Sequence, residues 1–150
     1  MSAEDLAPMT VPPESLGPAT LLFVDDESSI LSALRRLFRP RGYKILTAES
    51  GAAGLVILEQ EAVDLVVSDM RMPEMDGAQF LEQVRARKPE TMRILLTGYA
   101  DVTSTINAIN KGEIYRHVSK PWDDNDIVLI VQKALEHKRL EGENRRLLAL

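Results

Sequence analysis

The sequence predicts an α/β domain with a doubly wound sheet of five parallel strands, and two features of the chain carry this prediction. Five short apolar runs recur along it, and segments with apolar residues at helical spacing separate them. The runs are mostly continuous and do not alternate with polar residues, which is typical of parallel strands covered by helices on both faces. The length of 150 residues suits one such domain with tails.

The predicted strands lie at regular intervals, and each is followed by a predicted helix. The strands cover residues 20–24, 43–48, 64–68, 93–98 and 115–120. The fifth run is the most polar, which predicts a strand at the edge of the sheet. Each helix presents one apolar face, formed in chain order by Ile30, Leu34 and Phe38, by Leu55 and Leu58, by Phe80 and Val84, by Val102, Ile106 and Ile109, and by Ile127, Ile130, Val131 and Ala134.

The two ends of the chain differ from this repeating core. Residues 1–19 contain four of the eight prolines and show neither periodicity, so we expect a flexible leader. Residues 20–138 form the predicted domain, and residues 139–150 are interpreted as a helical linker toward an output domain that this chain lacks. A coiled coil and a frayed linker remain alternatives for this extension, whose heptad positions would be His137, Leu140, Asn144 and Leu147.

Composition and charge exclude several classes of function. Without cysteine, neither a disulfide framework nor a thiolate metal site can form. No apolar stretch reaches the length of a membrane span and no signal-peptide pattern opens the chain, so we expect a cytoplasmic protein. The net charge of −5 disfavours binding to nucleic acid or anionic membranes and indicates proteins or small ions as partners. His117 and His137 have no companions at metal-ligand spacing and are interpreted as structural or surface residues.

Polar side chains follow the predicted strands at the points where they end. Asp25 and Asp26 follow the first strand, Asp69 follows the third, Thr97 lies at the end of the fourth, and Lys120 ends the fifth. Because the carboxyl ends of parallel strands share one edge of the sheet, we expect these side chains to lie together. A single aspartate at such a turn is more often a helix cap than a reactive group. Three together would repel one another unless a cation neutralised them.

This set of residues predicts phosphoryl chemistry supported by a metal ion. Carboxylate oxygens and water suit Mg²⁺, and Asp25 and Asp26 supply the acid pair. Asp69 is then a plausible nucleophile toward phosphorus, while Lys120 and Thr97 can bind phosphoryl oxygens. Whether the bond between Lys120 and Pro121 is cis is left open. The two remaining loop residues, which either shape the loop after Asp69 or only punctuate it, are Pro73 and Gly77.

Four motifs in combination resemble a known family. They are VDDE at 24–27, SDMRMPEMDG at 68–77, LLTGYAD at 95–101 and VSKPW at 118–122. With them the chain resembles the receiver domain of two-component response regulators over residues 20 to about 138. The resemblance implies a flavodoxin-like (βα)5 fold with strand order 2-1-3-4-5. TGYAD and GEIYRHVSKPW are also similar to receivers that precede cyclic-di-GMP phosphodiesterase domains of the HD-GYP type.

The resemblance also implies a role for each site residue. Asp69 would accept a phosphoryl group from a sensor histidine kinase or a phosphotransfer protein, and Thr97 and Lys120 would bind that group. The Mg²⁺ ligands would be Asp25, Asp26, Asp69 and the main-chain carbonyl of Arg71.

The resemblance further implies a conformational switch. Thr97 would turn toward the phosphoryl group and Tyr115 would rotate inward behind it, although Tyr115 can also be read as an exposed aromatic residue of an edge strand. The face formed by helix four, strand five and helix five would then change shape and control an output domain or a partner. A homodimer through this face or through the C-terminal helix is one expected assembly.

A phosphohydrolase is the alternative function from another class. A Mg²⁺-dependent phosphohydrolase can also use an aspartyl-phosphate, but such enzymes commonly carry a second acid two residues after the nucleophile. Arg71 occupies that position and cannot act as a general acid or base there. Nucleotide-binding motifs of the GxxxxGK[ST] or GxGxxG type are absent. The sequence therefore favours a signalling module that promotes only its own phosphorylation and dephosphorylation, and not an enzyme.

Overall fold

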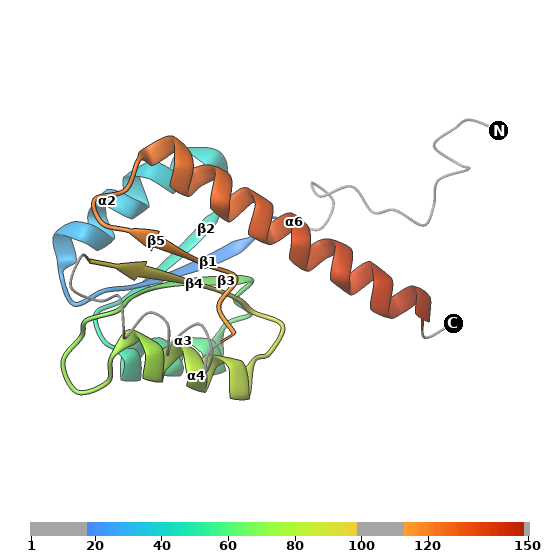
Figure 1. Cartoon of the computed structure of the whole chain (residues 1–150), viewed down its shortest axis with the longest axis horizontal. Helices are drawn as coiled ribbons and strands as arrows, with labels where there is room; N and C mark the ends of the chain where they lie inside the picture. The colour runs from blue at the N-terminus through green and yellow to red at the C-terminus, as the bar shows by residue number, and fades with distance from the viewer. Residues whose placement is uncertain (1–17, 99–112, 149–150) are drawn as a thin grey trace.

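A single parallel sheet of five strands forms the centre of the computed structural model, which describes residues 18–98 and 113–148. The strand order is β2-β1-β3-β4-β5 (Figure 1). All four strand pairs are parallel. This confirms the predicted doubly wound, flavodoxin-like topology and its strand order.

The observed strands agree with the predicted ones to within one residue at each end. They are β1 Thr20–Val24, β2 Lys44–Ala48, β3 Leu65–Asp69, β4 Met92–Thr97 and β5 Arg116–Ser119. The described helices are α2 Ser28–Phe38, η2 Arg39–Arg41, α3 Gly51–Gln60, α4 Gly77–Arg87 and α6 Asp124–Leu148. The predicted helix with Val102, Ile106 and Ile109 lies outside the described residues.

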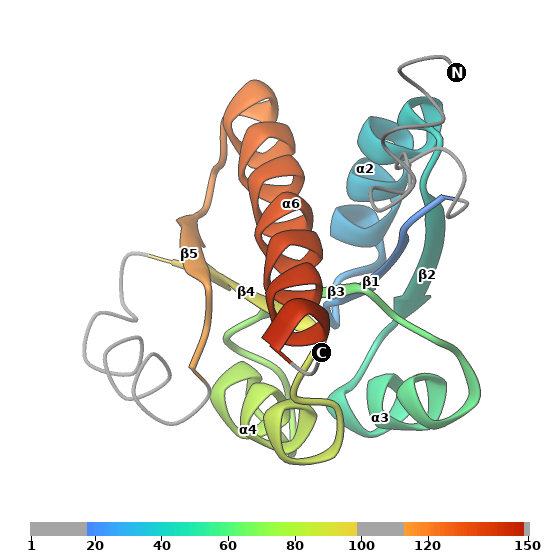
Figure 2. The ribbon, with the colours of Figure 1, turned by 90° about the vertical axis from the view of Figure 1, so that its right-hand side faces the viewer.

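Helices cover the sheet on both faces and make a three-layer domain. Helices α2 and α6 lie on one face, and α3 and α4 lie on the other (Figures 1 and 2). Successive strand residues point to opposite faces, so Phe23 joins the core under α2 and α6 while Val24 joins the core under α3 and α4. Because both faces are buried, the central strands are mostly apolar and do not alternate with polar residues.

Strand β5 lies at the edge of the sheet and helix α6 extends past it. Of the β5 residues only Val118 is buried, which agrees with the polar character of this run. Helix α6 buries residues in its first half, then continues through Gly142 to Leu148 with Leu140 and Leu147 exposed. Helix α6 continues without a break across the predicted domain boundary after residue 138. A coiled coil through the heptad positions stays a prediction.

Two ion pairs connect α6 to the amino-terminal edge of the sheet. Lys138 Nζ lies 3.6 Å from an oxygen of Asp64, just before β3, and Arg145 lies 3.3 Å from Glu90, before β4. Within residues 18–98 and 113–148, no helix has both the length and the apolar character needed to cross a bilayer.

Candidate functional site

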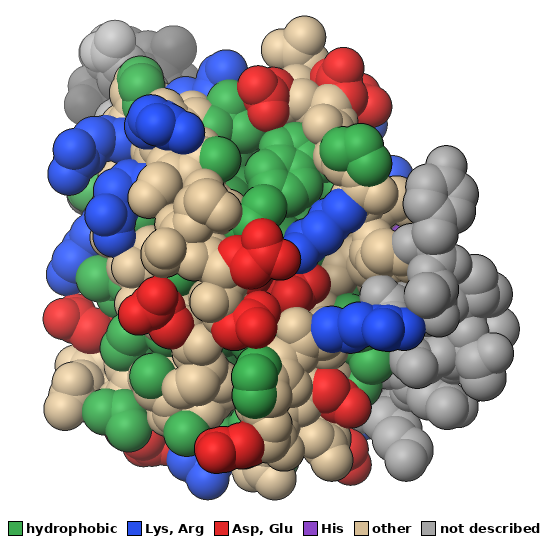
Figure 3. All heavy atoms as spheres, turned by 90° about the vertical axis from the view of Figure 1, so that its left-hand side faces the viewer, with side chains coloured by type: hydrophobic (Ala, Val, Ile, Leu, Met, Phe, Trp, Pro, Cys, Tyr) green, Lys and Arg blue, Asp and Glu red, His purple; other side chains and the backbone are tan. Residues whose placement is uncertain are grey.

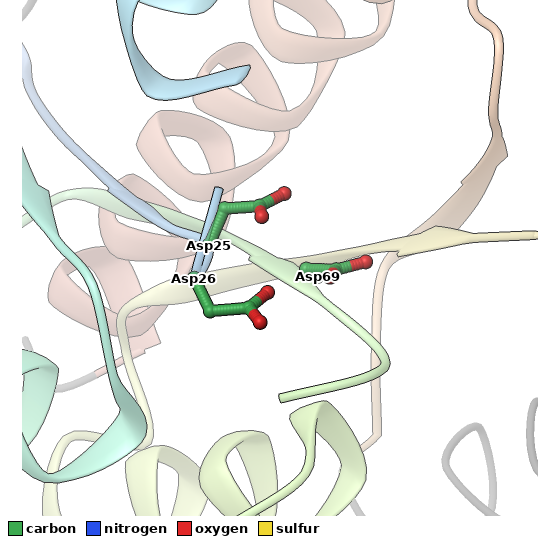
Figure 4. A group of neighbouring side chains, drawn as sticks. All are labelled: Asp25, Asp26 and Asp69. Atoms are coloured by element: carbon green, nitrogen blue, oxygen red, sulfur yellow. The ribbon is translucent and has the colours of Figure 1, made fainter. Parts of the chain in front are cut away.

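Three aspartates meet at the carboxyl-terminal edge of the sheet. Asp25 and Asp26 directly follow β1, and Asp69 is the last residue of β3, which pairs with β1. One carboxylate oxygen from each lies within 4.8 Å of the others. All three side chains point the same way from the two strand ends (Figure 4). The structure therefore brings together the acids that the sequence predicted to be neighbours.

Asp25 is the most deeply buried of the three. It is 0% exposed, its main-chain N–H donates to Ala48 O at 3.1 Å, and its Oδ1 accepts a 2.9 Å bond from the Glu27 N–H. Burial raises the pKa of Asp25 and the nearby charge of Asp69 raises it further, against the opposing hydrogen bond from Glu27 and the charge of Lys120. An ionised carboxylate at this depth needs a cation close by.

Lys120 supplies one such cation. Its Nζ lies 3.2 Å from Asp25 Oδ2 and 2.9 Å from Asp69 Oδ1. Burial alone would lower the pKa of Lys120, but the hydrogen bond to Asp69 and the charges of both acids outweigh burial and raise it. The ammonium group therefore stays charged between the two carboxylates. The bond between Lys120 and Pro121 is cis, which answers the question that the sequence left open.

Thr97 lies beside Lys120 at the end of the neighbouring strand. It is the last residue of β4 and is 4% exposed. Its carbonyl oxygen accepts a 2.7 Å hydrogen bond from the main-chain N–H of Lys120, directly beyond the Thr97–Ser119 pair of the ladder. All the predicted residues that would contact a phosphoryl group, namely Asp69, Thr97 and Lys120, thus lie at one edge of the sheet.

The donor set fits a hard divalent cation. Three carboxylates and one ammonium leave an excess of two negative charges, and carboxylate oxygens are the ligands that Mg²⁺ prefers. Asp26 is exposed, so the cluster is reachable from solvent. Acidic side chains gather near the middle of this face, with basic side chains beside them (Figure 3). Arg71 is exposed in the loop after β3, and its main-chain carbonyl stays a predicted ligand.

Gly77 is a site residue whose role the sequence leaves open. Its N–H donates a 2.7 Å hydrogen bond to Met70 O, which closes the loop that follows Asp69. A Cβ atom on Gly77 would lie 2.8 Å from Met70 Cα and 2.9 Å from the carbonyl carbon of Asp69. Real Cβ atoms do not approach backbone so closely, so this position requires glycine. An Asp-Gly step before a helix signals only a turn, and nothing in the sequence signals this close contact.

Tyr115 lies apart from the predicted switch partner. It directly precedes β5, and its ring contacts that of His137 in α6 at a centroid distance of 5.5 Å. Tyr115 packs with the core under α2 and α6. Thr97 follows Leu95 by two residues in β4, so its side chain points to the same face as that of Leu95, which is the opposite face, under α3 and α4. Within β5, His117 is the ladder partner of Leu95 and so lies on the same face of the sheet as Thr97. The inward rotation of Tyr115 stays a prediction.

Similarity to known proteins is strong and covers most of the chain. Residues 21–132 match the family model of the response regulator receiver domain. The transcriptional regulatory protein GlrR of Escherichia coli is 39% identical over 128 residues, which cover 85% of this chain and 29% of that protein. The hydrogenase transcriptional regulatory protein HoxA of Cupriavidus necator is 36% identical over 129 residues, with coverages of 86% and 27%. The chain spans less than a third of the length of these curated relatives.

Solved structures show the same fold. The signal receiver domain of an HD domain-containing protein from Pseudomonas fluorescens superposes with a TM-score of 0.79 at 41% identity, covering 81% of this chain and 98% of that chain. A CheY-like response regulator receiver domain protein from Methanospirillum hungatei gives a TM-score of 0.80 at 27% identity, with coverages of 84% and 100%. The similarity therefore extends over nearly the whole of both solved domains.

Proposed function

The chain belongs to the response regulator receiver domain family of two-component systems, and from this premise we propose that it takes a phosphoryl group onto Asp69 to control an output domain or partner. The observation that best supports this proposal is the position of Lys120. Its ammonium contacts both Asp25 and Asp69, at the edge where the acidic cluster lies. A charged lysine beside a nucleophilic carboxylate suits the transfer of an anionic group.

In the proposed transfer, one carboxylate oxygen of Asp69 forms a bond to phosphorus. The phosphorus–nitrogen bond of a phosphohistidine on a sensor kinase or phosphotransfer protein breaks, and the imidazole nitrogen keeps the electron pair. Lys120 offsets negative charge on the transferred group, and the Thr97 hydroxyl donates to one of its oxygens. Mg²⁺ would supply charge neutralisation when held by the proposed ligands Asp25, Asp26, Asp69 and the Arg71 carbonyl.

The modification would act through charge. A phosphoryl group adds about −1.5 to −2 charges at one strand end, which biases a two-state arrangement of nearby elements. The proposed switch uses Thr97 and Tyr115 and changes the face formed by helix four, β5 and α6. The predicted helix with Val102, Ile106 and Ile109, which would be helix four of the family, falls outside the described part of the chain.

The proposed output lies beyond the last helix. The division into a leader over 1–19, a receiver over 20–138 and a linker over 139–150 is part of this proposal. The greater length of the relatives supports an attached output domain, and the similarity to the receiver of an HD domain-containing protein favours the HD-GYP type. Such a regulator would work in the cytoplasm, where its kinase presents the phosphoryl group, and could dimerise through the switch face or α6.

The test is stoichiometric modification of one residue. The protein is incubated with Mg²⁺ and acetyl phosphate, and intact mass spectrometry counts the phosphoryl groups. One group is expected on the parent and on the control Asp126→Asn, an exposed acid outside the site, and none on Asp69→Asn. Modification of Asp69→Asn to the same extent as the parent would refute the proposal. Many turnovers on a small phosphate ester would instead establish the phosphohydrolase alternative.

A further inference from the structure

We propose that Gly77 is a positioning residue that sets where the carboxylate of Asp69 lies. This inference rests on the proposed function, because it concerns the residue that would accept the phosphoryl group. Helix α4 begins at Gly77, and the absence of a side chain lets the first turn of the helix lie directly against the backbone of Asp69 and Met70. The first turn of α4 therefore packs directly against the backbone at the end of β3 and limits where that backbone can lie.

Hydrogen bonds hold the backbone at the end of β3 on two sides. The N–H of Met70 donates a 2.9 Å hydrogen bond to Leu96 O in β4, and the carbonyl of Met70 accepts a 2.7 Å bond from Gly77. Met70 is therefore held on one side by the neighbouring strand and on the other by the helix. A methyl group at position 77 would meet the backbone of Asp69 before it met any side chain.

Helix α4 is equally fixed from its own side. A reciprocal pair of hydrogen bonds between Asp76 and Gln79, at 2.8 and 3.0 Å, caps its first turn. Phe80 lies in this first turn and Leu81 follows it. Both side chains are 0% exposed in the core between the sheet and helices α3 and α4. Retreat of the helix would open a cavity beside these side chains, which is costly in a close-packed core.

The strain from a side chain at position 77 would fall first on the backbone of Asp69 and Met70, because these are the nearest groups to the added Cβ atom. The Asp69 carboxylate contacts Lys120 at 2.9 Å and belongs to the acidic cluster with Asp25 and Asp26. A displacement of Asp69 changes both relations at once, and metal sites are sensitive to small changes in how a ligand is held. The expected effect is a loss of Mg²⁺ affinity beyond any loss of stability.

The experiment compares Gly77→Ala with Gly54→Ala. A Cβ at Gly54 would meet Phe80 ring atoms at 2.9 Å and Val24 Cγ2 at 3.2 Å, so this control strains the same core without touching Asp69. Calorimetry gives the Mg²⁺ dissociation constant of each folded variant, and urea unfolding gives its stability. Gly77→Ala is expected to weaken Mg²⁺ binding by about tenfold or more. Gly54→Ala is expected to bind Mg²⁺ as the parent does, even though it is less stable.

Three outcomes would overturn the inference. Mg²⁺ binding by Gly77→Ala equal to that of the parent would overturn it, as would an equal weakening in Gly54→Ala. The third outcome uses trimethylamine N-oxide, an osmolyte that stabilises folded proteins. If Gly77→Ala stays unfolded in its presence while Gly54→Ala folds, the glycine is required for folding and not for the position of Asp69, which also overturns the inference. A parent that binds Mg²⁺ but takes no phosphoryl group from acetyl phosphate would count against the proposed function and leave the metal comparison to be judged separately.

Discussion

Removal of the Lys120 ammonium is the most direct test of the charge balance at the site. Replacement by methionine keeps much of the volume of the side chain and deletes its charge. Asp25 and Asp69 would then lie close together without the cation that now contacts both of them. We expect Lys120→Met to lower the free energy of unfolding, because a buried carboxylate without a partner is far more costly than a paired one.

The size of the effect follows from burial. The side chain of Asp25 is 1% exposed and that of Asp69 is 9% exposed, so water screens the remaining charges poorly. Breaking such a buried pair typically costs about 3 to 5 kcal/mol. We expect the lower end, about 3 kcal/mol, because Asp25 keeps its hydrogen bond from Glu27 and can take up a proton. With a urea m-value of about 1.5 kcal/mol/M, the unfolding midpoint would fall by about 2 M.

The assay is urea unfolding followed by the fluorescence of Trp122, the single tryptophan. Lys44→Met is the matched control, because the pair of Lys44 with Glu61 has side chains 53% and 43% exposed and should contribute less than about 1 kcal/mol. Adding Mg²⁺ should raise the midpoint of Lys120→Met more than that of the parent, since the cluster then lacks any other cation. A loss no larger than that of Lys44→Met would refute the reasoning.

Three further predictions concern pH, a buried arginine and a helix cap. The folded pKa of Lys120 lies above its ordinary value of 10.5, so its contribution to stability is present below 10.5 and lost as pH rises through the raised pKa. The stability difference between parent and Lys120→Met should therefore persist up to that pH in urea titrations and shrink above it. Arg93, which is 8% exposed, donates to three main-chain carbonyls, so Arg93→Met should cost about 3 kcal/mol in the same assay, and a loss of only a few tenths would contradict this. Asp76→Ala removes the cap of α4 and should cost about 1 kcal/mol, measured against the neutral change Glu82→Gln in the same helix.

The sheet could be predicted from the sequence because buried parallel strands have a simple pattern. Each central strand is an uninterrupted apolar run, and each run ended within one residue of its predicted limit. The informative errors concern polar residues at the ends of these runs. Arg93 appeared as the polar tip of its run, yet it is buried inside β4, where its guanidinium binds main-chain carbonyls instead of solvent. Asp64, predicted in the third strand, precedes β3 and accepts a bond from the Thr20 N–H.

The gathering of the site residues could be predicted for a similar reason. Parallel strands place their carboxyl ends at one edge, so Asp25, Asp69 and Lys120 meet whatever the details of the loops. Side-chain direction and atomic clearance depend on three-dimensional detail that no motif carries. The need for glycine at position 77 arises from a contact with residues seven and eight positions earlier in the chain, which becomes visible only once α4 is packed on the sheet.

Lys120 links the state of the site to the rest of the edge strand. The main-chain N–H of Lys120 is bonded to Thr97 O, and its Nζ contacts Asp69, so it is tied both to β4 and to the proposed phosphoacceptor. A phosphoryl group on Asp69 would occupy the place next to Asp69 Oδ1 and draw Nζ toward its own oxygens. The start of β5 in turn contacts α6 through the rings of Tyr115 and His137. A change in how Lys120 is held is therefore expected to reach α6 along β5 and through the contact between Tyr115 and His137.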